Sequence, residues 1–257
     1  MAAPERRRAN VTSAFGGPVQ IFSASAGEGF PMTSAHADMD RVRRTLQGFN
    51  GGGAGFLRIY RPYPTAAFSP RDTTLENYAA AADAMRARGF EPVERRAGGQ
   101  LAVYDGNALV VDLAAPHGEP RAEVQERFKL FSGVIAQAFI SLGIDARVGA
   151  IGGEYCPGDY SVNGEGRIKL AGIAQRIARR GYHLGAVISV MPSGRAIAAA
   201  TEAYRILGYS CDPATFGALA GLVPGLSFAK LGERLHDALA EILLEGELVR
   251  MEFCETV

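Results

Sequence analysis

One amphipathic helix between two groups of strand patterns is the feature that most constrains the fold of this chain. Apolar residues recur at three- and four-residue steps through residues 120–142, which predicts a helix with one apolar face. Pro120 suits the first turn of that helix, and Gly143 suits its C-terminal cap. The apolar positions are Val124, Phe128, Phe131, Ile135, Phe139 and Leu142.

Shorter patterns predict the remaining elements. The expected strands span residues 56–60, 65–68, 91–95, 100–104, 108–113, 146–150, 160–163, 168–175, 183–190 and 248–255. The other expected helices span residues 35–47 (capped by Ser34), 75–88 and 193–207, and a last one is capped by Ser227. Strands and helices do not alternate regularly, so the order favours an α+β domain with a mixed or antiparallel sheet flanked by helices. We expect a single domain over residues 34–257, preceded by a loosely ordered tail or edge element over residues 1–33.

Composition excludes several classes of function. The net charge of zero over 257 residues argues against a general nucleic-acid binder. The most apolar window, residues 128–144, is too short and too polar to cross a membrane, and the basic start of the chain has no apolar stretch after it that would make a signal peptide. The three cysteines, Cys156, Cys211 and Cys254, cannot all pair and match no zinc template, which favours a reduced, cytoplasmic compartment and no metal site.

A glycine pair flanked by arginines is the first candidate for chemistry. Gly98 and Gly99 follow Arg95 and Arg96, and Gln100 comes next. Paired glycines let a ligand lie against the backbone, and the arginines suit a carboxylate, a phosphate or an acidic partner. The alternative is an ordinary hairpin turn with a solvated basic edge.

Cys156 is the second candidate, because it lies in a loop rich in glycine and proline between two expected strands. A nucleophilic cysteine reacts as the thiolate and therefore needs a nearby cation. The alternative is a small apolar residue in a turn.

Lys169 is the candidate cation. Strand alternation places Lys169 on one face with Ala171 and Ile173, and Gly172 on the other, so the lysine has small or apolar neighbours. This pattern suits a lysine that points into an apolar pocket, although an edge-strand lysine that resists aggregation fits as well. His183 could line the same pocket or be a satisfied core histidine.

Together these segments resemble the biotin/lipoate protein ligase and octanoyltransferase superfamily. Residues 95–104 resemble its Arg-x-x-Gly-Gly acyl-binding segment, residues 169–176 its lysine-bearing strand, and residues 182–185 its aromatic-His-His-Gly stretch. The resemblance implies the class II synthetase-like catalytic domain of that superfamily, with Cys156 and Lys169 as catalytic residues. The residues implied to bind substrate are Arg95, Gly98, Gly99, Gln100, Tyr104, Gly172 and His183.

One branch of that superfamily is the most similar. Cys156-Pro157-Gly158 followed by Tyr160 resembles the amidotransferases that move octanoyl groups from the glycine cleavage H protein to other lipoyl domains, as do residues 69–72. In those enzymes the cysteine holds the acyl group as a thioester. Asp105, where many relatives have histidine, leaves the acyl donor open.

The resemblance therefore implies transfer of an octanoyl or lipoyl group through Cys156 to a lysine of a carrier protein. The implied partners are the glycine cleavage H protein and the E2 subunits of 2-oxoacid dehydrogenases, and no dissociable cofactor is required. Two alternatives remain: an ATP-dependent lipoate-protein ligase, which would need ATP and Mg²⁺ but no cysteine, and a non-catalytic acyl-binding homologue. The presence of Lys169 argues against the second alternative.

Overall fold

The computed structural model of the protein describes residues 19–23, 34–225, 227–231, 233–235 and 237. The helices with both ends inside these ranges are α1 (Ala35–Gly48), α2 (Tyr78–Ala87), α3 (Val124–Ser141), α4 (Gly194–Leu207) and α5 (Leu219–Leu222), with short 3₁₀ helices η1 (Phe49–Gly51), η2 (Asp72–Thr74) and η3 (Pro213–Thr215). The strands are β1 (Val19–Ser23), β2 (Gly55–Tyr60), β3 (Thr65–Phe68), β4 (Glu91–Glu94), β5 (Ala102–Tyr104), β6 (Ala108–Pro116), β7 (Ala146–Val148), β8 (Val162–Gly164), β9 (Ile168–Ala178) and β10 (Gly181–Ser189).

Two sheets organise these strands. The large sheet has the order β1-β2-β6-β10-β9-β8-β7, and the small sheet has the order β4-β3-β5. β1 pairs with β2 in parallel, and the other neighbours in the large sheet are antiparallel. The expected α+β class with a mixed sheet flanked by helices is therefore confirmed.

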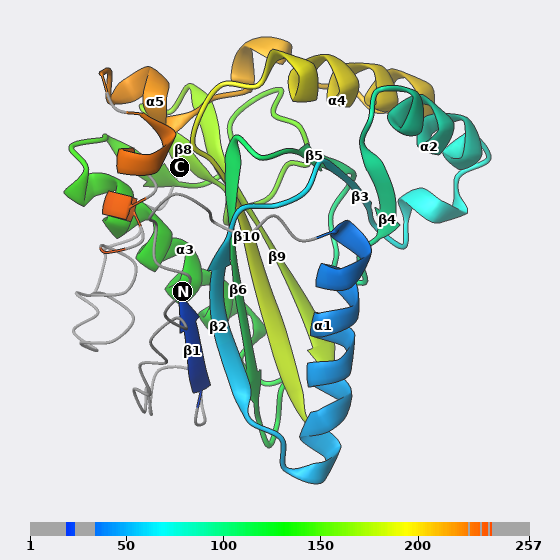
Figure 1. The fold of residues 1–257 in the computed structure, drawn as a ribbon, viewed down its shortest axis with the longest axis vertical. Helices are drawn as coiled ribbons and strands as arrows, with labels where there is room; N and C mark the ends of the chain where they lie inside the picture. Colours follow the sequence, from blue (N-terminus) through cyan, green and yellow to red (C-terminus); the bar gives the residue numbers. More distant parts are fainter. Residues whose placement is uncertain (1–18, 24–33, 226, 232, 236, 238–257) are drawn as a thin grey trace, which may run out of the picture.

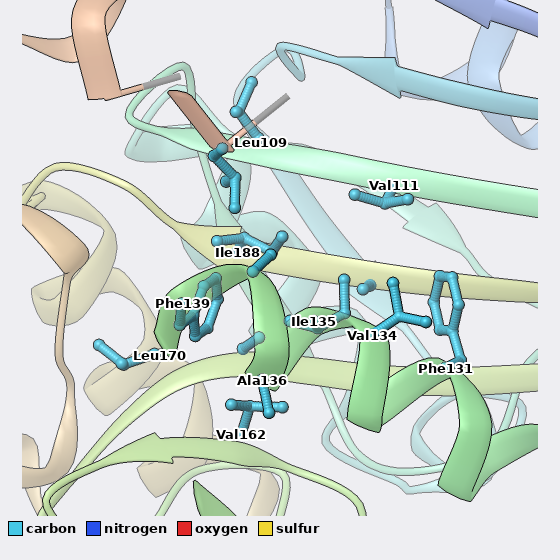
Figure 2. Packing of buried hydrophobic residues seen from close by; sticks show 14 of the residues in the cluster. Leu109, Val111, Phe131, Val134, Ile135, Ala136, Phe139, Val162, Leu170 and Ile188 are labelled. Atoms are coloured by element: carbon cyan, nitrogen blue, oxygen red, sulfur yellow. The ribbon is translucent and has the colours of Figure 1, made fainter. Parts of the chain in front are cut away.

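Helices cover both faces of the large sheet (Figure 1). Successive residues of β2 point to opposite faces, so Phe56 packs near Leu46 of α1, whereas Leu57 joins the main core with α3. Phe131 and Phe139 of α3 are fully buried in that main core, and Figure 2 shows α3 lying along the strands. The apolar stripe predicted for this helix is thus the face that it buries.

A second hydrophobic cluster lies between the small sheet, α2 and α4. Phe68 of β3, Met85 of α2 and Tyr204 of α4 are buried in it, and Figure 1 shows α2 and α4 side by side. Tyr155 also belongs to this cluster, and Cys156 packs against it. The loop that carries the cysteine is therefore held between the second cluster and the edge of the large sheet.

Most expected elements are present, with shifted ends. Ser34 caps α1 as expected, because its Oγ accepts a hydrogen bond from Ala37 N at 3.2 Å. α3 begins at Val124 rather than at Pro120, because the chain first makes a turn in which Ala122 N donates to Glu119 O.

Part of the N-terminal segment forms the edge of the large sheet. The sequence predicts either a loose tail or an edge element for residues 1–33. Residues 19–23 form β1, which is an edge strand of the large sheet. The rest of residues 1–33, the expected strand 248–255 and Cys254 lie outside the described residues.

None of the helices within the described ranges combines the length and the apolar character that crossing a bilayer requires. Over the same ranges, His, Cys, Asp and Glu side chains form no group of three or more that could hold a metal ion.

Candidate active site

The sulfur of Cys156 lies against the glycine-rich segment, 56 residues away in sequence. Gln100 N donates to Cys156 Sγ at 3.2 Å, and a guanidinium nitrogen of Arg95 donates to it at 3.6 Å. The same Arg95 nitrogen donates to Gln100 O at 2.7 Å, so the turn and the arginine form one unit. A backbone amide and a cation directed at one sulfur suit a thiolate. Two of the segments singled out in the sequence therefore meet at a single atom.

Lys169 approaches the same cysteine from β9, but it contacts the backbone and not the sulfur. Its Nζ donates to Cys156 O at 2.8 Å, to Tyr155 O at 3.0 Å and to Glu154 Oε1 at 3.2 Å. An ammonium has three protons, so all of them have acceptors in the cysteine loop. Lys169 is only 1% exposed. Burial lowers the pKa of Lys169, and the negative charges of Glu154 and Cys156 oppose that shift.

The face on which Lys169 lies corrects the expectation from strand alternation. β8 pairs Val162 with Ala171 but Asn163 with Lys169, so Leu170 is an extra residue in β9 and forms a β-bulge. As a result, Lys169 lies on the face of Gly172 and not on that of Ala171. A Cβ added at Gly172 would lie 3.4 Å from Lys169 Cε. Leu170 and Ala171 both enter the main core.

Glu154 is a member of the site that the sequence analysis missed. Its carboxylate is buried and accepts hydrogen bonds from Ile151 N, Gly158 N and Ser161 Oγ, in addition to Lys169. Three of these donors belong to the loop that carries Cys156, so Glu154 ties that loop to the lysine. No spacing signal in the sequence distinguishes Glu154 from a surface glutamate.

Tyr204 is a second missed residue, and it comes from α4. Cys156 N donates to its hydroxyl oxygen at 2.7 Å, and the hydroxyl donates to Leu101 O at 2.9 Å. Burial raises the pKa of Tyr204, so it stays a neutral donor and acceptor. Its hydroxyl thereby joins the backbone of the cysteine loop to the backbone next to Gln100. Cys156 itself has a φ of 44°, a conformation that needs such support.

A cavity of about 330 Å³ opens beside the sulfur, and it brings together most of the residues expected to bind substrate. They are Arg95, Gly98, Gly99, Tyr104 and Gly172, and the two residues expected to be catalytic, Cys156 and Lys169, line the same cavity. Gln100 contributes its backbone amide to the sulfur instead. Tyr155 forms another part of the wall, where its ring stacks on Phe216 with centroids 4.4 Å apart.

His183 lines a neighbouring cavity of about 380 Å³ together with Tyr104, Arg95 and residues of α1. Its Nε2 lies 2.9 Å from Asp112 Oδ1, and Asp112 Oδ2 accepts from Arg58 at 2.9 Å. Arg58 also donates to Asp38 of α1 at 2.7 Å. Burial would raise the pKa of Asp112, but His183 and Arg58 together lower it to about 2. We call these four residues the buried charge chain; His183 is thus neither a simple core histidine nor a neighbour of the thiol.

Comparison with known proteins identifies the family of the chain. The family model for the lipoyl protein ligase A/B catalytic domain matches residues 43–238. An octanoyl-GcvH:protein N-octanoyltransferase from Geobacillus kaustophilus is 30% identical over 185 residues, which cover 72% of this chain and 64% of that protein. The match thus spans less than two thirds of the relative's length.

Solved structures show the same fold. A lipoate-protein ligase A bound with ATP superposes with a TM-score of 0.60 at 14% identity, covering 89% of this chain and 85% of the other. A bipartite lipoate protein ligase from Thermoplasma acidophilum, described with its E2 lipoyl domain, gives a TM-score of 0.60 at 16% identity, covering 94% and 87%. The ligase-like fold implied by the sequence resemblance is therefore confirmed.

Proposed function

Because the chain belongs to the lipoyl protein ligase A/B catalytic domain family, we propose that it is an acyltransferase that moves an octanoyl group through a Cys156 thioester to a lysine of a lipoyl-carrier protein. The observation that carries this proposal is the position of Cys156 Sγ, 3.2 Å from Gln100 N at the wall of a cavity that also contains the buried Lys169. An adenylating ligase needs no cysteine there. The curated relative's name supports octanoyl as the acyl group and the H protein as a partner.

The first half-reaction loads the cysteine. The Cys156 thiolate attacks the acyl carbonyl carbon of the octanoylated donor, and the bond from that carbon to the donor's heteroatom breaks. The donor leaves with a proton, and the acyl group remains on the sulfur. Burial of the acyl methylenes along the apolar cavity wall favours binding by about 0.8 kcal/mol each.

The tetrahedral intermediate needs hydrogen-bond donors for its oxyanion. Gln100 N donates to the sulfur in the resting enzyme. The sulfur loses its negative charge when it bonds to the acyl carbon, and this N–H then becomes the first such donor to the oxyanion. All three protons of Lys169 Nζ already have acceptors in the cysteine loop. Lys169 therefore becomes the second donor when it gives up its hydrogen bond to the carbonyl of Tyr155 or Cys156 and donates to the acyl oxygen instead.

The second half-reaction regenerates the enzyme. The neutral amine of the acceptor lysine attacks the thioester carbonyl, and the carbon–sulfur bond breaks. The nitrogen gives its proton to the departing sulfur, which leaves the new amide and the free Cys156 thiol. The proposed acceptors are lipoyl domains such as those of E2 subunits. This route uses no ATP, metal or dissociable cofactor.

Intact mass spectrometry tests the proposal. The full chain is incubated with octanoylated glycine cleavage H protein without ATP, and its mass is compared with those of Cys156→Ala and the control Cys211→Ala. An octanoyl adduct on the unchanged chain and on Cys211→Ala, but not on Cys156→Ala, is expected. No adduct, with lipoate transfer that requires ATP and survives Cys156→Ala, would assign the chain to the ligases instead.

A further inference from the structure

The cavity at Cys156 and the cavity at His183 are neighbours over the same face of β9 and β10. Both are lined by Tyr104, Ala174, Gly185 and Val187. The second cavity lies between the sheet and α1, which contributes Met39 to its wall. An acyl chain attached to the sulfur can therefore extend along the sheet beneath α1.

The strand register gives the distances along this path. β9 and β10 pair Gly172 with Val187, Ala174 with Gly185, and Arg176 with His183. Gly172 lies next to the Lys169 side chain, which marks the reacting end. Two residues of a strand advance by about 7 Å, so the second pair lies about 7 Å and the third about 13 Å beyond the lysine.

An extended octanoyl chain fits this interval. Seven carbon–carbon bonds, each advancing about 1.3 Å along the zigzag for a bond length of ~1.5 Å, span about 9 Å from carbonyl carbon to methyl. The methyl end therefore comes between the levels of Gly185 and His183. The His183 ring leans back over that place, since a Cβ added at Gly185 would lie 3.1 Å from His183 Cε1 and 3.3 Å from Asp112 Oδ1.

The buried charge chain holds the His183 side chain in place at this end of the path. His183 is held by Asp112, Asp112 by Arg58, and Arg58 by Asp38, with contacts of 2.9, 2.9 and 2.7 Å across four elements. An ordinary apolar wall can repack around a longer chain, but displacing His183 would take from the buried Asp112 the partner that lies 2.9 Å from its Oδ1. We propose that the His183–Asp112 pair is the stop that limits the acyl group to about eight carbons; this inference rests on the proposed function.

Two substitutions should move the chain-length preference in opposite directions. His183→Ala opens the path beyond Gly185, so the ratio of decanoyl to octanoyl adducts should rise about tenfold, the factor expected when two more methylenes are buried. Gly185→Ala adds a methyl group in front of the stop and should raise the ratio of hexanoyl to octanoyl adducts. His117→Ala, which removes a histidine that lines neither cavity, should change neither ratio.

The measurement is intact mass spectrometry after exposure to an equimolar mixture of hexanoyl, octanoyl, decanoyl and dodecanoyl N-acetylcysteamine thioesters. The unchanged chain should carry mainly octanoyl. Equal loading of octanoyl and dodecanoyl, or unchanged ratios in His183→Ala, would overturn the stop. If His183→Ala does not fold, Gly185→Ala is the deciding variant, because it keeps all four residues of the buried charge chain.

A binding measurement separates this inference from the proposed function. In Cys156→Ser, which cannot form the thioester, octanoate should raise the melting temperature more than dodecanoate does. Equal shifts, or none, would overturn the chain-length stop even if acyl transfer is established. If octanoate stabilises the variant selectively but the unchanged chain forms no adduct, the chain-length stop is supported and the proposed transferase activity is contradicted.

Discussion

Gly99 and Cys156 are so close that residue 99 cannot carry a side chain. A Cβ at this position would lie 2.9 Å from Cys156 Sγ and 2.8 Å from the Arg95 guanidinium, and the φ of Gly99 is 96°. Both the close approach and the left-handed backbone require glycine. At Gly98, by contrast, an added Cβ meets nothing within 4 Å.

Gly99→Ala should therefore displace the sulfur while the fold is kept. We expect acyl loading of Cys156 to fall about 100-fold, the typical effect of misplacing a reacting group by about 1 Å. Gly98→Ala is the matched control and should load within a few-fold of the unchanged chain. The rate of adduct formation by mass spectrometry measures both, and equal rates for the two variants would contradict the role assigned to Gly99.

Arg95 should govern the reactivity of the thiol. Removing a hydrogen bond to a charged group typically costs ~1.5 kcal/mol or more, so Arg95→Met should slow alkylation of Cys156 by iodoacetamide about tenfold at neutral pH. Arg96→Met is the control, because Arg96 is exposed and donates no hydrogen bond to the sulfur. Peptide mass mapping separates Cys156 from the other cysteines. A larger effect from Arg96→Met would assign the role to the wider basic surface.

Glu154 and Lys169 should show strong energetic coupling. Lys169→Met leaves a buried carboxylate without its cation, and Glu154→Gln leaves a buried ammonium without its anion, so each should lower the free energy of unfolding by about 3 kcal/mol. The double variant should lose clearly less than the sum of the two. Urea unfolding of the four proteins completes the cycle. Additive losses would show that the pair is not a unit.

Acid should weaken the buried charge chain. The pKa of Asp112 is lowered from 3.8 to about 2 in the folded protein, so its contribution is fully present above about pH 4 and is lost as the pH falls through 2. The shift corresponds to about 2 kcal/mol. The difference in free energy of unfolding between the unchanged chain and Asp112→Asn should therefore shrink between pH 5 and pH 2.5, as measured by urea titration. A constant difference would mean that this carboxylate does not titrate in that range.

Local chemistry in the sequence was enough to predict much of the fold. The apolar stripe of α3 and the Ser34 cap of α1 depend on neighbours within a few residues, and the α+β class follows from the order of such elements along the chain. The family resemblance, and not spacing, implied that Cys156 and the Gly98-Gly99 turn belong to one site. The contact itself joins segments 56 residues apart.

What the sequence could not supply depends on pairing between distant strands and helices. Lys169 faces the site because of an extra residue in β9, and alternation alone cannot reveal a bulge. Tyr204 reaches Cys156 across 48 residues of sequence, and Arg58 reaches Asp112 across 54. Such networks leave no periodic signal in the sequence. The periodicity of each strand or helix reflects how it packs in the core, and it does not show which polar side chain on another element it meets.

The bulge at Leu170 makes the orientation of Lys169 depend on the number of residues in the neighbouring strand β8. One residue inserted into β8 opposite Leu170 would give the extra residue a partner and let the two strands pair without interruption. Lys169 would then rotate toward the hydrophobic core, although no side chain in the site had been altered. In a gene, a single in-frame codon added within β8 could thus remove the lysine from the cavity as completely as the loss of its own codon.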